Sequence, residues 1–381
     1  MLQVIIDTSI YRKDPKRDKV GFRALGRLCR GQKVKLYVPE VVKREFVSQQ
    51  RTAIEEEVQT ILSAAKCISR RTKENKLLEF ALKTIALADT VAPRIGAKTR
   101  LEFKGWIEQC GADVLAIRPK HGNRVMDDYF DGNPPFTSPK HRDDIPDSFI
   151  FENIVDVASD QETVYVIVND GALYKSLGTI NNVKAFKELD EFINTEECQE
   201  ALEELTGEIV THNIERARQI IPQKVDDLNR MIDVDLVNVL ADQTVRDSQI
   251  PDDNGEATIT MVGAAEDVEF DFDGIEYYGG SEIGIPFSAT TECSLNYAIY
   301  QSDYYTMNEG ESAKISITEL NDHYFDAEQD FPIGVKGTLS VEIRVERLED
   351  PEVSQGDLET AIVEGEHKVE VEKIWIARGD S

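Results

Sequence analysis

The sequence predicts an α/β unit followed by a β-rich unit, and three observations support this division. Up to about residue 200, short apolar runs alternate with helical segments, which is typical of a largely parallel sheet. After about residue 250, apolar and polar residues alternate between Gly, Asn and Asp turns, as in an antiparallel sheet or sandwich. The charge changes as well: residues 1–100 hold 22 Lys and Arg against 11 Asp and Glu, whereas residues 201–381 hold 12 against 41.

At 381 residues the chain is long for a single compact domain. We therefore expect an α/β domain over residues 1–205, a helical connector over 206–248 and an acidic, sandwich-like β domain over 249–381. The net charge of −29 would by itself oppose nucleic-acid binding, but the acidity belongs to the C-terminal half. Five cysteines without a CxxC pair, and no apolar run long enough to cross a bilayer, predict a soluble protein of the reducing cytoplasm.

Apolar runs and helical spacing predict the elements of the first unit. Pro39 is expected at the first position of a helix, and several long helices are expected between about 50 and 110. Residues 118–144, which contain Pro and Gly, are expected to be a loop; 145–158 form a helix, and the chain is helical again from about 186 to 245. The strands are expected at residues 2–6, 33–38, 113–117 and 163–168.

Four acidic residues are expected near the carboxyl edge of the parallel sheet, the edge where such sheets bind ligands. Asp7 and Asp170 follow the first and last of these strands at their carboxyl ends, where open parallel sheets bind ligands. Glu45 lies on the helix after the second strand, and Asp147 lies at the start of the helix before the last strand. Each acid also has an ordinary explanation, as a turn residue, a surface acid or a helix cap.

Taken together, the four acids predict a metal site. If they meet at one sheet edge they repel one another, and a divalent cation is the usual relief. Oxygen ligands without His or Cys suit Mg²⁺ or Mn²⁺, and such ions support phosphodiester hydrolysis. The sequence therefore predicts a metal-dependent nuclease. A phosphatase with an aspartyl nucleophile would need a second acid where Ser9 stands. A non-catalytic binding or assembly protein, whose acids only cap helices, remains the alternative.

Four segments within about residues 1–190 resemble the PIN-domain ribonucleases: VIIDTS, VPEVVKREF, PPFTSPKHRDDIPDSFI and VYVIVNDGALY. The resemblance implies a Rossmann-like PIN fold with a central parallel sheet and a helical insertion, similar to the larger bacterial variants. It also implies cleavage of single-stranded RNA, sometimes DNA, with Mg²⁺ or Mn²⁺. By position, Asp7, Glu45, Asp147 and Asp170 look like the catalytic metal ligands, and Asp144 like an accessory ligand.

Basic residues near these acids are candidates for holding the nucleic-acid backbone, and simple solvation is the competing explanation. They are Arg12, Lys13, Lys43, Arg44, Lys140, His141 and Arg142. Thr8 or Ser9 could hydrogen-bond Asp7 or a scissile phosphate, and Asn169 could orient Asp170. The β domain is expected to bind a protein partner or to regulate the nuclease, and no membrane association is expected.

Overall fold

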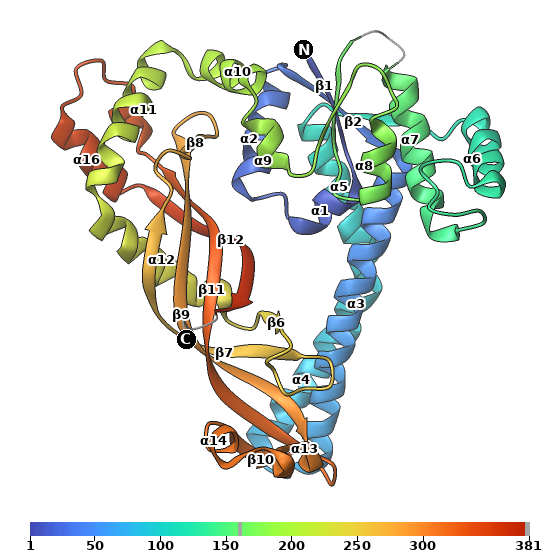
Figure 1. Ribbon diagram of the computed structural model, residues 1–381, viewed down its shortest axis with the longest axis vertical. Helices are drawn as coiled ribbons and strands as arrows, with labels where there is room; N and C mark the ends of the chain where they lie inside the picture. Colours follow the sequence, from blue (N-terminus) through green and yellow to red (C-terminus); the bar gives the residue numbers. More distant parts are fainter. Residues whose placement is uncertain (159–161, 378–381) are drawn as a thin grey trace. The chain divides into compact units, whose positions relative to one another are not determined.

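The computed structural model describes residues 1–158 and 162–377. The chain forms two compact units, Met1–Ala201 and Leu202–Ser381, each with its own sheet (Figure 1). The helices over residues 208–240, expected as a connector, belong to the second unit. The predicted domain boundaries at 205 and 248 stay predictions.

The first unit is built on a five-stranded parallel sheet, so the predicted α/β class is confirmed. The strand order is β3-β2-β1-β4-β5, which places β1 at the centre, and its residues Val4, Ile5 and Ile6 are fully buried. The short strand β5 was not predicted, because its VKAF run is half-exposed and too brief to show a pattern. The strands are β1 (Leu2–Ile6), β2 (Val34–Pro39), β3 (Asp113–Leu115), β4 (Val164–Ile167) and β5 (Val183–Phe186).

The predicted helical insertion is present and begins with a helix of 32 residues. Pro39 is the last residue of β2 and the N-cap of the long helix rather than its first residue, because its extended backbone still pairs with Leu115 of β3. The first helices of the chain are α1 (Thr8–Lys13), α2 (Val20–Arg30), α3 (Glu40–Arg71), α4 (Asn75–Val91), η1 (Ala92–Arg94) and α5 (Ile95–Gln109).

The expectation of a loop over residues 118–144 is wrong for its first half. Helix α6 (Pro119–Asp131) occupies it and ends at Gly132, which adopts the left-handed conformation that favours glycine. Ion pairs to α7 (Ile145–Ala158) hold helix α6 in place, and the local sequence does not reveal these contacts. The prediction of a helix over 145–158 is confirmed. The remaining helices before the second unit's sheet are η2 (Arg142–Asp144), α7 (Ile145–Ala158), α8 (Gly171–Leu177), α9 (Leu189–Ile193), α10 (Glu196–Thr206), α11 (Glu208–Ile220), η3 (Ile221–Gln223) and α12 (Val225–Leu240).

The second unit contains a seven-stranded antiparallel sheet, which confirms the β-rich class. The sandwich-like arrangement is not found among the described residues: their strands belong to one sheet. Helix α12 packs against β7 and β12 with its buried face of Leu228, Ile232 and Leu236. Alternation in a sequence shows that one face of a strand is buried but not what covers it. The strands are β6 (Thr244–Arg246), β7 (Glu256–Phe270), β8 (Glu276–Tyr277), β9 (Glu282–Tyr300), β10 (Ser316–Glu319), β11 (Tyr324–Glu342) and β12 (Glu366–Ile376).

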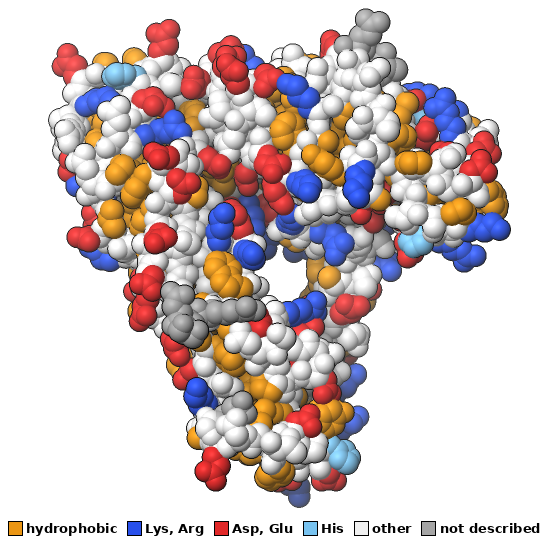
Figure 2. Space-filling view, viewed as in Figure 1, with side chains coloured by type: hydrophobic (Ala, Val, Ile, Leu, Met, Phe, Trp, Pro, Cys, Tyr) orange, Lys and Arg blue, Asp and Glu red, His pale blue; other side chains and the backbone are white. Residues whose placement is uncertain are grey.

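Four short helices complete this unit: α13 (Gln301–Thr306), α14 (Glu309–Ser312), α15 (Val345–Leu348) and α16 (Gln355–Val363). In the view of Figure 2, Asp and Glu side chains are spread along the visible face of the β-rich unit rather than gathered in one cluster. Within the described part of the chain, no helix has the length and apolar character that crossing a membrane requires.

Candidate functional site

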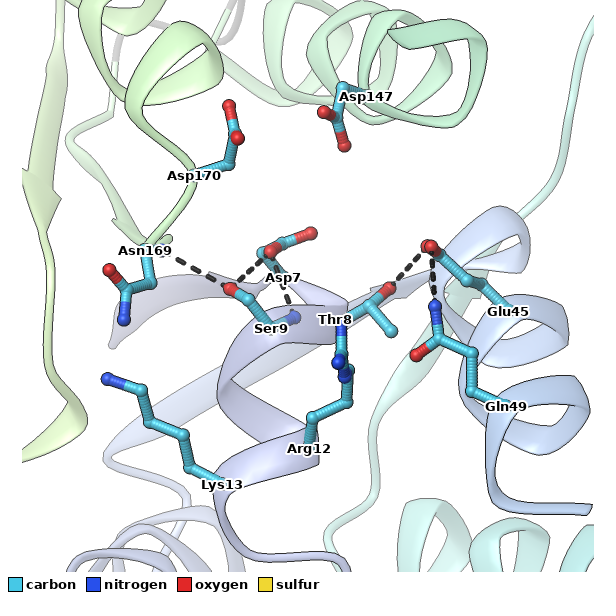
Figure 3. A pocket seen from close by; sticks show the side chains of 10 residues that line it. All are labelled: Asp7, Thr8, Ser9, Arg12, Lys13, Glu45, Gln49, Asp147, Asn169 and Asp170. Carbon is cyan, nitrogen blue, oxygen red and sulfur yellow. Dashed lines mark hydrogen bonds between the residues drawn. The ribbon is translucent and has the colours of Figure 1, made fainter. Parts of the chain in front are cut away.

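A pocket of about 550 Å³ opens at the carboxyl ends of β1 and β4, and all four predicted acids line it (Figure 3). They come from four separate elements: Asp7 follows β1, Glu45 lies on α3, Asp147 lies on α7 and Asp170 follows β4. The other residues that line the pocket are Thr8, Ser9, Arg12, Lys13, Gln49 and Asn169.

Asp7 is the most buried of the four acids and has 4 % of its surface exposed. It is the N-cap of α1, and its carboxylate accepts hydrogen bonds from the backbone N–H of Ser9, at 3.0 Å, and from the Ser9 hydroxyl. Burial raises the pKa of Asp7 above its ordinary value, although these bonds to Ser9 oppose the shift. Asp7 therefore both caps a helix and contributes an acid to the pocket.

Glu45 is held at both carboxylate oxygens. The Thr8 hydroxyl donates to one oxygen at 2.7 Å, and the Gln49 amide donates to the other at 2.9 Å. Burial is the main cause that raises the pKa of Glu45. The expected hydrogen bond to Asp7 comes from Ser9, whereas Thr8 links α1 to α3. Gln49 was not predicted, and its only signal is its position one helical turn after Glu45.

Asp170 is the N-cap of α8, as its ordinary explanation requires. One carboxylate oxygen accepts the backbone N–H groups of Ala172 and Leu173, both at 2.8 Å. The side chain is half-buried and still lines the pocket. The backbone N–H of the exposed Asn169 donates a hydrogen bond to the Ser9 hydroxyl at 3.3 Å. This backbone contact, rather than the expected bond from the Asn169 side chain to Asp170, holds the loop.

Asp147 shows most clearly that the four acids repel one another. Burial raises its pKa to about 8, and the charges of Asp7, Asp170 and Glu45 add to the shift in that order. Among the described residues, none of the four carboxylates forms an ion pair with a Lys or Arg side chain. The pocket therefore gathers four acidic groups without a direct ion pair among the described residues, although Arg12 and Lys13 also line it.

The donor chemistry of the pocket fits a hard divalent cation, because every acidic ligand offers oxygen and neither His nor Cys is present. The side chains are not closed around a single point: in the parts of the chain that are described, no three His, Cys, Asp or Glu residues are grouped closely enough to hold an ion. An ion would have to draw the four acids together.

Asp144, expected as an accessory ligand, is not among the residues that line the pocket. Its carboxylate accepts the backbone N–H of Thr137 at 2.7 Å and the Thr137 hydroxyl at 2.8 Å, and it lies 3.0 Å from the ring of His141. These contacts tie the preceding loop to the start of α7.

The predicted cations fall into three groups. Arg12 and Lys13 on α1 line the acidic pocket, and Lys13 also pairs with Glu188 at 2.7 Å. Lys43 and Arg44 pair with Glu40 and line a separate groove, and the third group is exposed in the loop before α7. That third group consists of Lys140, His141 and Arg142.

An aromatic cluster fixes the helices that carry the acids. The ring centroid of Tyr11 on α1 lies 5.8 Å from that of Phe46 on α3, and 5.2 Å and 5.7 Å from those of Phe103 and Trp106 on α5. Arg17, which follows α1 in the chain, lies over the Phe103 ring at 5.2 Å and so contributes to this packing. The cluster was not predicted, because its rings come from distant parts of the sequence.

Comparison with known proteins agrees with this geometry. The family described as PIN domain matches residues 4–174. No curated protein and no solved structure matches the chain. PIN domains are usually nucleases and generally use divalent metals, and the match spans all four pocket acids and four of the five strands of the parallel sheet. Residues 4–174 of the N-terminal unit therefore form a PIN domain.

Proposed function

We propose that this protein is a divalent-metal-dependent endonuclease that hydrolyses phosphodiester bonds, with single-stranded RNA as its preferred substrate. One observation carries the proposal: four carboxylates from four separate elements line one pocket without an ion pair among the described residues. Buried acids that serve stability alone are normally paired, because an unpaired buried charge is costly.

In this proposal Asp7, Glu45, Asp147 and Asp170 hold Mg²⁺ or Mn²⁺. The ion would stabilise negative charge on the phosphate and activate water for in-line hydrolysis. Ser9 orients Asp7, while Thr8 and Gln49 orient Glu45, so both carboxylates are preorganised.

The cations of the pocket complete the proposed site. Arg12 and Lys13 stand beside the acids, where they can bind the phosphates on either side of the scissile bond. Lys140, His141 and Arg142 are exposed just before α7 and would extend this contact along the strand. Contacts of this kind position a nucleic acid without reading its sequence.

The test is a cleavage assay on the full chain with end-labelled single-stranded RNA and DNA of one sequence, in Mg²⁺, Mn²⁺ or EDTA. We expect metal-dependent cleavage, faster on RNA, and a loss of at least about 100-fold for Asp147→Asn. The matched control is Asp143→Asn, which removes an exposed acid that does not line the pocket and should leave the rate unchanged. Equal cleavage by Asp147→Asn would assign the activity to another site or a contaminant.

The alternative is a PIN-fold protein that binds or assembles without catalysis. It is favoured by the helix-capping roles of Asp7 and Asp170 and by the lack of a closed three-ligand group among the described residues. RNA binding without cleavage in either metal, together with no Mn²⁺ binding by calorimetry, would support it.

For the β-rich unit we propose a partner-binding or regulatory role. Two observations support this proposal: residues 202–381 form a compact unit of their own, and this unit is strongly acidic, which disfavours direct contact with a polyanion. We also propose a cytoplasmic location, which the five free cysteines support.

A further inference from the structure

A second groove, of about 810 Å³, lies between α3, η1 and α5. Its walls carry four cations, Lys43, Arg44, Arg51 and Arg100. We propose that this α3–α5 groove binds the phosphate backbone of the nucleic-acid strand beyond the cleavage pocket. The proposal rests on the proposed function, because it assigns the path of that substrate.

The charge of the groove favours a polyanion. Glu40 and Glu55 are its two acids; Glu40 lies 3.2 Å from Lys43 and 2.9 Å from Arg44, and Glu55 lies 3.4 Å from Arg51. Four cations against two acids leave a surplus of positive charge. Arg100 is exposed and has no ion-pair partner among the described residues. Phosphate oxygens are the ligands that such a surplus recognises.

The shape of the groove is set by a glycine. The Cδ atom of Arg51 lies 2.7 Å from the point where a Cβ on Gly96 would stand, so the arginine stem crosses α5 at that residue. The remaining walls include Val47, Pro93 and Ala97, with no aromatic side chain on which a base could stack. The groove therefore fits backbone contact that is independent of base sequence.

Helix α3 connects the groove to the acidic pocket. Glu45 and Gln49 line the pocket, whereas Arg44 and Ser48, each one residue earlier, line the groove. Adjacent helical residues differ by about 100° around the axis, so the two walls are neighbouring stripes of one helix. Arg51 lies about 9 Å along the axis from Glu45, a distance that a few nucleotides can cover.

The test measures binding of the full chain to fluorescein-labelled single-stranded RNA by anisotropy, in EDTA so that no cleavage occurs. Arg51→Gln and Arg100→Gln should each weaken binding of a 12-nucleotide RNA by about three- to tenfold near 50 mM salt. Each should also reduce the dependence of affinity on salt by about one phosphate contact. A dinucleotide, too short to occupy the pocket and the groove together, should show no difference.

The matched control is Lys98→Gln, which removes one positive charge from the same helix outside the groove. It should change affinity by less than about twofold, and Arg100→Lys should retain most of the binding. Unchanged affinity in both arginine variants, an equal loss in Lys98→Gln, or a wild-type affinity that does not depend on RNA length would each overturn the proposal. The outcome is separate from the cleavage assay, because a protein that never cuts RNA can still show this pattern, and an active nuclease can lack it.

Discussion

At the scale of single residues, three of the pocket acids have local hydrogen-bond partners, whereas Asp147 has none among the described residues. Asp7 and Asp170 cap helices, and Glu45 is bonded by Thr8 and Gln49. The pKa of Asp147 is raised to about 8, because this residue is partly buried and faces the charge of the other three acids. The pKa of Asp147 therefore depends on the charges of all the acids in the pocket.

The pH dependence of stability follows from this shift. The folded pKa of Asp147 is about 8 and its ordinary value is 3.8, so between these limits the folded state keeps a proton that the unfolded state has released. The metal-free protein should lose stability as the pH rises from about 4 to about 8. Asp147→Asn cannot ionise and should raise the melting temperature of the metal-free protein at pH 8 by a few degrees.

The measurement is a set of thermal melts in EDTA from pH 4 to pH 9. The gain from Asp147→Asn should disappear near pH 4, and Asp143→Asn should follow the wild type throughout. Adding Mn²⁺ should raise the melting temperature of the wild type more than that of Asp147→Asn, because only the wild type has all four ligands. A lower melting temperature for Asp147→Asn at pH 8 would show that a favourable partner holds the carboxylate.

At the scale of elements, α6 and α7 are joined by charges that lie far apart in the sequence. Asp156 on α7 lies 3.1 Å from Arg118 and 2.9 Å from the buried ring of His121. One turn earlier on α7, Glu152 lies 2.9 Å from Arg124. These contacts explain a helix that the sequence read as a loop, and they hold α7, which carries Asp147.

Removing Asp156 should therefore destabilise the PIN domain. Asp156→Ala leaves His121, which is 1 % exposed, without its carboxylate partner and should cost about 1–3 kcal/mol of the free energy of unfolding. Urea denaturation followed by circular dichroism measures this loss. The control is Asp127→Ala, an exposed acid on α6, which should stay within about 0.5 kcal/mol of the wild type. Equal stability of both variants would mean that packing alone holds α6.

At the scale of the whole molecule, the two units differ in architecture and in charge. The boundary between them falls at residues 201 and 202, inside α10, and helix α12 belongs to the second unit. Separate sheets and separate compact units imply that the PIN domain can fold alone.

Truncation tests this division. A chain that ends after Thr206 keeps α10 whole and should stay folded, without aggregating, and be as active as the full chain, or more so if the β-rich unit restrains it. A chain that ends near residue 250 keeps α12 but loses β7 and β12, so Leu228, Ile232 and Leu236 become exposed and the protein should aggregate. Size-exclusion chromatography and the cleavage assay distinguish the two. Loss of the fold in the shorter chain would show that the units share one core.

The sequence by itself determined four of the five strand positions of the parallel sheet, the helix over residues 145–158, the family resemblance, and the four acids of the pocket. These features have local signals: apolar runs of fixed period, and acids at the carboxyl ends of strands or at helix starts. Only the tertiary structure decided that α6 is a helix, that Asp144 bonds Thr137 rather than entering the pocket, that Thr8 and Gln49 hold Glu45, and that one sheet with α12 replaces a sandwich. The physical reason is that these outcomes depend on contacts between residues far apart in the chain, or on which of several hydrogen-bond partners a side chain meets once the fold has formed.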